Sequence, residues 1–348
     1  MGASLQPTDL GKHGAHAPAC RSVDDESCNR LRRRLVLGAC GAIVIANVRA
    51  ATSKDIASVV VLDAGLPEDA RQDFRAEFAR HGYFDGRNLK LSFKDWGGDM
   101  TALEAHARAI VASRPDLICS SYTAASLLLT RLTQDIPIVF SDATDPDRTG
   151  LVESLRVPGR NATGVSNRFL ETVGKRLELL KEIRPGSRAL ALVIPKESRW
   201  GALMREAVAL SSRRVGLAVR EVPVLEKPDE KQLVQALKRT GADAFLPADV
   251  FLPPPLWVQI QTAAEMPGLF SRSAIVRAGG MLSVGPDQLD QFRRKVAIAA
   301  RILRGERPSH LPVDQAAIIE IALNRKTATA FGWEVPSSVL LRLTEVVG

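Results

Sequence analysis

Residues 56–63 read IASVVVLD, an almost unbroken apolar run that ends on an acidic residue. A short run this rich in Val and Ile predicts a strand buried on both faces, as in a parallel sheet. The next segment, residues 68–81, carries Phe74 and Phe78 four positions apart, which predicts an amphipathic helix. A buried strand followed by an amphipathic helix is the repeating unit of an α/β fold.

The same alternation continues along the chain in two sets. The first set has expected strands at residues 89–96, 117–121, 137–142 and 161–167, with helices at 100–113, 123–133 and 148–155. The second set has expected strands at 189–195, 217–223, 242–247 and 281–284, with helices at 171–183, 201–214, 229–240, 253–265 and 289–303. Such units form parallel sheets through right-handed crossovers. We therefore predict two Rossmann-like α/β lobes joined by a hinge.

The length supports two lobes, because 348 residues exceed the roughly 250–300 at which one hydrophobic core stops growing. We assign residues 54–165 to lobe 1 and residues 166–272 to lobe 2. Part of residues 273–325 is expected to complete lobe 1, and part of residues 326–348 to complete lobe 2.

Residues 1–50 are expected to be an N-terminal extension and a signal peptide. The basic cluster at residues 30–34 precedes an apolar stretch at 35–46, and small residues follow around Ala50. This order is typical of a secretory signal, and the apolar stretch is shorter than the ~20 residues of a membrane-spanning helix. Arg33 and Arg34 also resemble a twin-arginine signal. The sequence thus predicts periplasmic location after export by a Sec or twin-arginine type signal.

The cysteines indicate neither a disulfide nor a metal site. Of the four, only Cys119 lies beyond the predicted leader, and its apolar neighbours predict a buried position in a strand. Residues 37–40 read LGAC, but only five apolar residues precede Cys40 in that run, so lipid attachment there is not favoured. We expect no metal and no cofactor.

Composition and charge exclude several classes of protein. The chain is 45% hydrophobic and 25% charged, which is ordinary for a folded domain and excludes wholesale disorder. The net charge of +8 is spread along the sequence without a long basic run. A nucleic-acid partner is therefore not expected.

Ligands of parallel sheets bind beyond the carboxyl ends of the strands, so the strand-to-helix loops hold the candidate binding residues. The first-lobe candidates are Asp63, Gly65, Ser120, Ser121, Tyr122, Thr123, Ser141, Asp142, Thr144 and Asn167. The second-lobe candidates are Asp249 and Gly279.

These residue types suit a small molecule that carries a carboxylate. Ser121 and Thr123 open an expected helix, where hydroxyls and free N–H groups can hold a carboxylate. Asp142 or Asp249 could then face an ammonium group. The alternative interpretation is structural, with ordinary N-capping at Ser121 and Thr123 and a capped turn at residues 141–146.

Enzyme signatures are missing from the sequence. It contains no G-x-S-x-G, Walker, H-E-x-x-H or G-x-G-x-x-G motif. His81, His106 and His310 have no partner at a metal-ligand spacing. We therefore expect a binding protein rather than an enzyme.

Several segments together resemble the ABC-transporter substrate-binding family whose better-known members bind tryptophan and other aromatic amino acids. They are residues 78–88 (FARHGYFDGRN), 136–140, 145–146, 150–155, 158–166, 174–180, 278–283, 302–308, 311–313 and 324–328. The resemblance implies the type I periplasmic-binding-protein fold and an importer component that captures an amino acid or related organic acid between its lobes. It also implies a membrane permease and an ATPase as partners, membrane contact only through them, and a monomeric protein.

Two other functions remain open at the level of the sequence. The same fold could serve a periplasmic sensor that signals to a receptor partner. An exported hydrolase or isomerase could use Asp142, Asp145 or Asp249 as acid and base, although no nucleophile–base pair is readable. A cytoplasmic repressor relative is disfavoured, because no helix-turn-helix precedes the first lobe.

Overall fold

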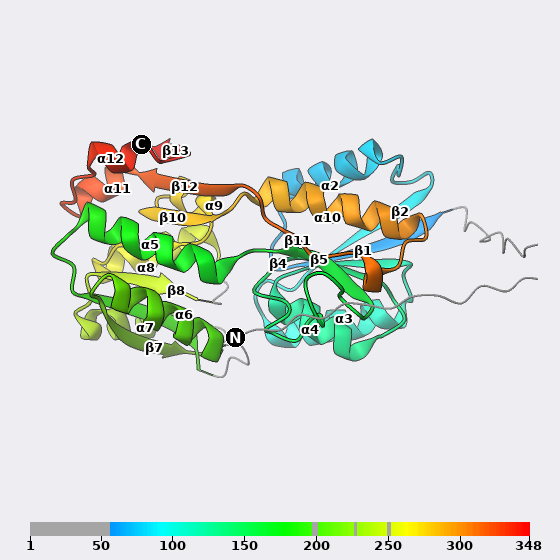
Figure 1. The fold of residues 1–348 in the computed structure, drawn as a ribbon, viewed down its shortest axis with the longest axis horizontal. Coiled ribbons are helices and arrows are strands. Elements are labelled where there is room, and N and C mark those ends of the chain that lie inside the picture. The colour runs from blue at the N-terminus through cyan, green and yellow to red at the C-terminus, as the bar shows by residue number, and fades with distance from the viewer. Residues whose placement is uncertain (1–55, 197–200, 226–227, 249–251) are drawn as a thin grey trace, which may run out of the picture. The chain divides into compact units, whose positions relative to one another are not determined.

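Strand β1 (Ala57–Asp63) has a parallel neighbour on each side, β2 (Leu89–Asp95) and β3 (Leu117–Ser121). The structure is a computed structural model that describes residues 56–196, 201–225, 228–248 and 252–348 (Figure 1). The last five residues of β1 are buried, which confirms the strand predicted from its apolar run.

The first sheet has six strands in the order β11-β5-β4-β3-β1-β2, and all its pairs are parallel. Its further strands are β4 (Ile138–Ala143), β5 (Ala162–Ser166) and β11 (Asp314–Gln315). The helices that cover it are α2 (Glu68–Arg80), α3 (Met100–Ala112), α4 (Thr123–Leu132) and α10 (Gln288–Leu303) (Figure 1).

Alternate side chains of β1 point to opposite faces of the sheet, and the four helices are divided between these two faces. Val59 and Val61 pack in one cluster with Phe74 of α2 and Val296 of α10. Val60 and Leu62 belong to another, together with buried side chains of α3 and α4. This period of two is what a strand buried on both sides requires. The sheet and its four helices form the first lobe.

The second lobe contains two smaller sheets. One has the order β7-β6-β8 and is parallel, with β6 (Ala189–Pro195), β7 (Ala218–Val224) and β8 (Ala244–Pro247). Its helices are α5 (Phe169–Ile183), α6 (Gly201–Arg214), α7 (Glu230–Thr240) and α8 (Pro254–Ala264). Leu190 and Leu192 of β6 pack with α5 and α6, whereas Ala191 and Val193 pack with α7 and α8.

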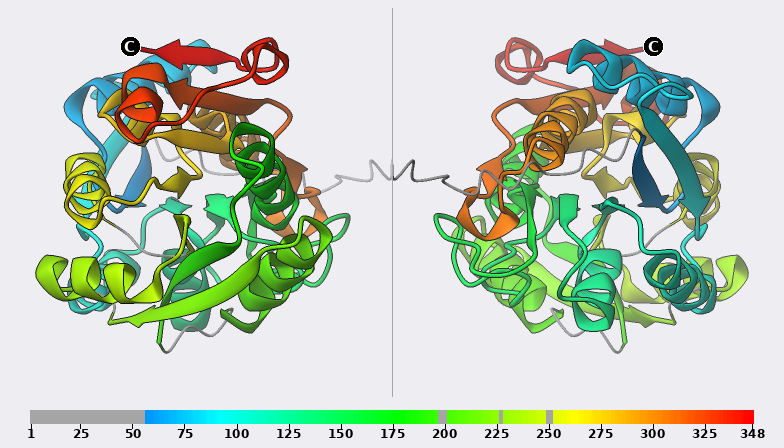
Figure 2. Two further views of the ribbon diagram at one scale, coloured as in Figure 1. Left: turned by 90° about the vertical axis from the view of Figure 1, so that its left-hand side faces the viewer. Right: turned by 90° about the vertical axis from the view of Figure 1, so that its right-hand side faces the viewer.

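The other sheet of the second lobe has the order β13-β12-β10-β9. Its strands are β9 (Leu269–Phe270), β10 (Leu282–Pro286), β12 (Ile319–Asn324) and β13 (Glu345–Val347), joined by α9 (Ser273–Arg277), α11 (Arg325–Ala330) and α12 (Ser337–Leu340). Strand β12 runs antiparallel to β10 and parallel to β13, beside which it lies in Figure 2. The antiparallel pair is an exception to the parallel pairing predicted from the sequence.

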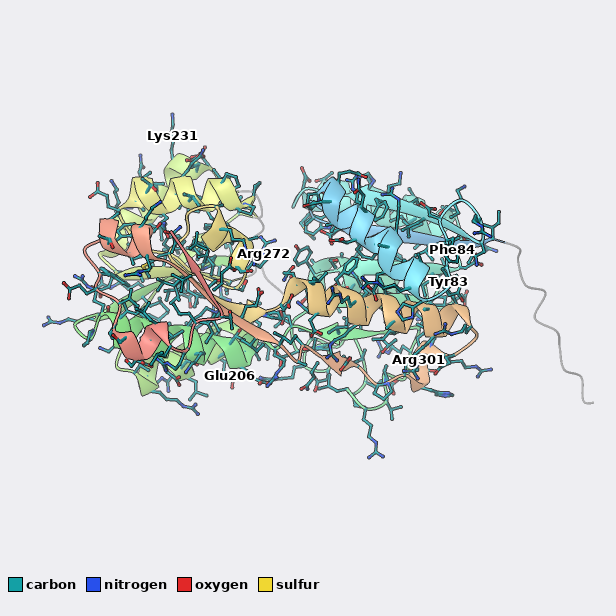
Figure 3. All side chains as sticks on the ribbon, turned by 90° about the horizontal axis from the view of Figure 1, so that it is seen from above. Tyr83, Phe84, Glu206, Lys231, Arg272 and Arg301 are labelled. Carbon is teal, nitrogen blue, oxygen red and sulfur yellow. The ribbon has the colours of Figure 1, made fainter. Side chains whose placement is uncertain are left out.

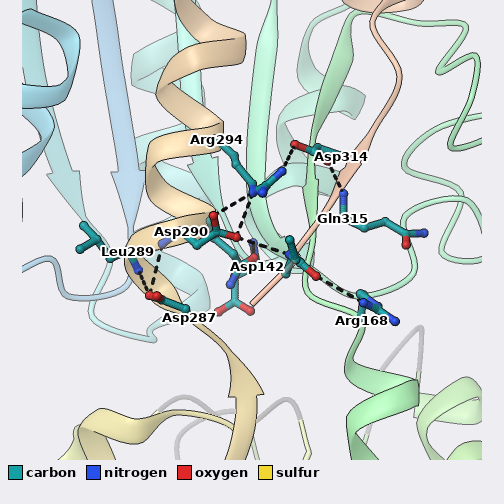
Figure 4. A network of polar contacts seen from close by, with 11 residues as sticks. Asp142, Arg168, Asp287, Leu289, Asp290, Arg294, Asp314 and Gln315 are labelled. Carbon is teal, nitrogen blue, oxygen red and sulfur yellow. Dashed lines mark hydrogen bonds and ion pairs between the residues drawn. The ribbon is translucent and has the colours of Figure 1, made fainter. Parts of the chain in front are cut away.

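The chain passes between the lobes at three connections, after β5, after β10 and after β11. They are hydrogen-bonded to one another: Ala316 donates to the carbonyl of Ser166 (3.1 Å) and Asp287 to that of Ile318 (2.9 Å). Figure 4 shows the ion pairs beside them, in which Arg294 of α10 contacts Asp290 (2.9 Å) and Asp314 (2.8 Å). The lobe boundaries given above stay predictions.

The helix predicted at residues 148–155 is wrong. The segment is a series of turns in which the amides of Leu151 and Val152 both donate to the carbonyl of Pro146. Gly150 has a φ of 77°, which is incompatible with a right-handed helix. Leu151 and Val152 are nevertheless buried, which explains their apolar pattern.

The predicted leader, including Cys40, lies outside the described residues. Within the part of the chain that the structure describes, no helix is both long enough and apolar enough to cross a membrane.

Candidate functional site

The loops that follow β3, β4 and β5 are tied together at one edge of the first sheet. The amide of Tyr122 donates to the carbonyl of Ser141 (2.9 Å), and the amide of Thr144 donates to the hydroxyl of Thr123 (2.9 Å). The side-chain amide of Asn167 donates to the carboxylate of Asp142 (2.9 Å). These bonds fix the positions of the loop side chains relative to one another.

Two residues at this edge of the sheet hold an unusual backbone conformation. Tyr122 has a φ of 73° and Asp142 a φ of 52°, in the region that non-glycine residues rarely occupy. Such conformations cost of order 1–3 kcal/mol each and cluster at functional sites. The hydrogen bond from Tyr122 to Ser141 and that from Asn167 to Asp142 hold both residues in place.

A first pocket, the interlobe pocket, has about 590 Å³ of empty space. The first lobe lines it with Tyr122, Thr123, Asp142, Thr144 and Asn167. The chain beyond β5 contributes Phe169, Met204, Pro247, Trp257, Phe270, Ser271, Arg272 and Ile275. One wall is therefore rich in hydrogen-bonding groups, and the opposite wall is mostly apolar.

A second, larger space, the α2–α10 groove, has about 1340 Å³ of empty space. It is lined by Asp63, Gly65, Leu66, Pro67, Ala70, Asp73, Phe74, Ser121, Tyr122, Ser141, Asp142, Pro254, Arg272, Ala274, Gln288, Leu289, Gln291, Phe292 and Lys295. Tyr122, Asp142 and Arg272 line both spaces, so the groove and the interlobe pocket adjoin at these three residues.

The charged groups at this junction are buried or partly buried. Burial raises the pKa of the Asp142 carboxyl, while the hydrogen bond from Asn167 and the charge of Arg272 act in the opposite direction. Arg272, labelled in Figure 3, follows β9 and donates to the hydroxyl of Tyr122 (3.3 Å). Burial also lowers the pKa of Lys295, which lies at the wall of the groove. The junction thus presents both a carboxylate and cationic donors.

Most of the residues predicted from the sequence line one of the two spaces. Asp63, Gly65, Ser121 and Ser141 line the groove, and Thr123, Thr144 and Asn167 line the interlobe pocket. Tyr122 and Asp142 line both.

Two predicted residues are placed differently, and a third lies outside the described residues. Ser120 is fully buried, with its hydroxyl 2.7 Å from that of Ser126, and it lines neither space. Gly279 forms a turn of the second lobe with a φ of 122°, and its carbonyl accepts from Thr327 (2.9 Å). Gly279 also lines neither space. Asp249 lies outside the described residues.

The sequence did not point to the second-lobe wall or to two cationic residues, Arg272 and Lys295. Arg272 stands in a segment without a recognisable motif. Lys295 carried a readable signal, because it lies four positions after Gln291 on the face of α10 that the apolar residues occupy. A lysine on the apolar face of an amphipathic helix is unusual enough to single out.

No metal centre is found in the described ranges, where no three His, Cys, Asp or Glu side chains gather as a metal ion would need. Cys119 is buried in β3, as predicted, and burial raises the pKa of its thiol to about 12. Such a thiol is unreactive at neutral pH.

The family described as ABC transporter substrate binding protein matches residues 55–347 of the chain. A curated relative, the tyrosine-binding protein of Clostridioides difficile strain R20291, is 24% identical over 265 residues, which are 76% of each chain.

Two solved structures are similar in fold. A conserved domain protein from Vibrio cholerae superposes with a TM-score of 0.75 at 26% identity, over 83% of this chain and 99% of that one. A domain from Streptococcus pneumonia in complex with L-Trp gives a TM-score of 0.75 at 24% identity, over 84% of this chain and all of that one. These matches confirm the type I periplasmic-binding-protein fold. The family match over residues 55–347 confirms that the chain is a substrate-binding protein rather than an enzyme.

Proposed function

The chain belongs to the ABC transporter substrate-binding protein family, and we propose that it is the exported component of an importer that captures an aromatic amino acid. The observation that carries this proposal is the composition of the interlobe pocket. Hydrogen-bonding loop residues line one wall, and Phe169, Trp257 and Phe270 stand among the residues of the other. An aromatic amino acid matches both walls, because its charged end can bind the polar wall and its ring can pack against the aromatic one.

The polar wall suits the charged end of such a ligand. Thr123 is the first residue of α4, where free N–H groups and the helix dipole favour a carboxylate. Asp142 would accept the ammonium group, and Asp249 is the second candidate for that role. A ligand bound by both walls would favour a closed arrangement of lobes 54–165 and 166–272, completed by their C-terminal segments.

The names of the relatives support the same ligand class. One relative is named for tyrosine and one structure holds L-Trp. Export to the periplasm, a permease and an ATPase as partners, and a monomeric state complete the proposal.

Calorimetric titration of ligand-stripped protein with L-tryptophan, L-tyrosine, L-phenylalanine, L-leucine and L-glutamate tests this function. We expect the aromatic amino acids to bind most tightly and to raise the Tm. Binding of none of the five would contradict the proposal, and so would conversion of a bound ligand into a product. Native mass spectrometry of the freshly purified protein would identify a ligand carried through purification.

A further inference from the structure

Two polar side chains lie on the buried face of α10. Gln291 and Lys295 are one turn apart, and each is 2% exposed. The side-chain carbonyl of Gln291 accepts from the amide of Asp142 (3.1 Å), so Gln291 supports the end of β4 that carries the carboxylate. This contact accounts for Gln291 but leaves the role of Lys295 to be explained.

Lys295 is buried, and it forms no ion pair with a carboxylate of the residues that the structure describes. Its Nζ donates to the hydroxyl oxygen of Ser121 (3.0 Å) and lies 5.1 Å from the ring centroid of Phe74. Asp63 and Asp142 line the same groove, and their charges partly offset the lowering of the Lys295 pKa by burial. A buried ammonium group is costly unless an anion pairs with it.

Lys295 and Ser121 together present hydrogen-bond donors, and the direction of the bond between them is the reason. A charged lysine can only donate, so the oxygen of Ser121 accepts and its O–H remains available to donate elsewhere. Lys295 keeps two further N–H groups. Both residues line the α2–α10 groove. Up to three donors and one positive charge therefore stand at its wall.

The remainder of the groove suits an apolar body. Leu66, Pro67, Phe74, Leu289 and Phe292 all line it. Because the groove meets the interlobe pocket at Tyr122, Asp142 and Arg272, one ligand could extend from one space into the other.

We infer that Lys295 and Ser121 bind a carboxylate of the ligand at the wall of the α2–α10 groove. The inference rests on the proposed function and specifies its chemistry. A carboxylate there would form a direct ion pair with Lys295, and Asp63 and Asp142 would remain for an ammonium group. The carboxylate is either the α-carboxylate of an amino acid or a second acidic group at the end of its side chain.

The test compares aromatic ligands that differ in their carboxylate and ammonium groups. L-phenylalanine, L-phenylalaninamide, 4-carboxy-L-phenylalanine and the amine-free benzoate are titrated calorimetrically into the natural protein, Lys295→Met and Ser121→Ala. Lys90→Met is the matched control, since Lys90 is an exposed lysine of β2 and lines neither space. A hydrogen bond to a charged group contributes about 1.5–3 kcal/mol, so Lys295→Met should weaken carboxylate binding about 10- to 100-fold.

The ligands that lose affinity in Lys295→Met show which carboxylate Lys295 binds. If phenylalanine loses affinity in Lys295→Met and the amide does not, Lys295 binds the α-carboxylate. If only 4-carboxyphenylalanine loses affinity, Lys295 binds the second acidic group. Equal loss for acids and amide, or affinities within twofold of those of the natural protein for all ligands, would overturn the inference. In either case the proposed function would stand.

Two outcomes concern the proposed function itself. Binding of benzoate without any amino acid, lost in Lys295→Met, would remove the amino-acid proposal and keep the carboxylate site. Binding of none of these ligands to the natural protein would remove both. A folding defect is checked separately, because replacing a buried charge by Met should raise the Tm of the ligand-free protein, and Ser121→Ala gives a second, smaller perturbation of the same contact.

Discussion

The guanidinium of Arg272 donates a hydrogen bond to the hydroxyl of Tyr122 over 3.3 Å, although the two residues are 150 positions apart. Tyr122 follows the third strand of the first lobe, and Arg272 follows the short strand β9 of the second. Both residues line the interlobe pocket and the α2–α10 groove. A ligand in either space therefore meets side chains from both lobes at one junction.

Replacement of Arg272 by Met should weaken amino-acid binding by about 10- to 100-fold, because a cationic donor at the junction is lost. Calorimetric titration with the tightest-binding aromatic amino acid measures the effect. Arg239→Met is the control, since Arg239 is an exposed arginine of α7. Equal affinities for Arg272→Met and Arg239→Met would show that Arg272 takes no part in binding.

Amino-acid affinity should fall as the pH is lowered through the raised pKa of Asp142. The ammonium group of the ligand pairs with the ionised carboxylate, whereas a protonated Asp142 offers no charge. Asp142→Asn should lower affinity at pH 7 by about 10- to 100-fold and remove most of this pH dependence. Titrations from pH 4 to pH 8 measure the affinity and its pH dependence. If Asp142→Asn has the same pH profile as the natural protein, Asp142 does not bind the ammonium group.

The same carboxyl should affect the stability of the ligand-free protein. Its pKa is higher in the folded protein than in the unfolded chain, so its contribution is most favourable below the unfolded pKa. That contribution is lost as the pH rises through the folded pKa. Asp142→Asn should therefore gain stability relative to the natural protein as the pH rises, which thermal unfolding across the same pH range will measure.

Arg176→Met should stabilise the second lobe. Arg176 of α5 is fully buried, donates to Thr172 (2.9 Å) and lies over the ring of Phe169 (4.7 Å), but its Nε and one Nη have no hydrogen-bond partner among the described residues. Burial lowers its pKa to about 9. Met fills similar space without the desolvation cost, so the free energy of unfolding should rise by about 1–3 kcal/mol.

Urea denaturation of the ligand-free protein measures this change. Arg213→Met, at an exposed position of α6, is the control and should leave the midpoint nearly unchanged. A loss of stability in Arg176→Met would mean that the guanidinium contributes more than the contacts described above.

Gly285→Ala should destabilise the protein and disturb the site. A Cβ at Gly285 in β10 would lie 1.8 Å from the carbonyl oxygen of Ser271, next to Arg272. The segment that carries Arg272 must move, at a cost of about 1–3 kcal/mol. Gly186→Ala is the control, because a Cβ there meets no atom within 4 Å. A Tm equal to that of the control would contradict the close approach.

Local periodicity predicted most of the fold. Strands such as β1 and β6 are apolar on both faces, and α2 carries its stripe at helical spacing, so neighbouring residues alone determine these elements. The turns at residues 148–155 were predicted as a helix because the spacing of the buried residues Leu151 and Val152 resembles that of a helix. Short strands such as β9 and β13 were not predicted, because they are defined by pairing partners that lie elsewhere in the sequence.

The candidate site could be predicted on one side only. Loop position identified Asp142 and its neighbours, since the carboxyl ends of parallel strands meet at one edge. Arg272 and Lys295 reach that edge from the second lobe and from a helix near the C-terminus. Their contribution depends on how distant segments pack, and a local pattern contains no information on that.

The late part of the chain is divided between both lobes, and this has a consequence for biosynthesis. Strand β11 pairs with β5 of the first sheet, and β12 inserts between β10 and β13 of the second lobe. The first lobe lacks β11 until residues 314–315 have left the ribosome, and the second lobe lacks β13 until residues 345–347 have done so. A nascent chain would thus stay incompletely folded until translation is almost finished.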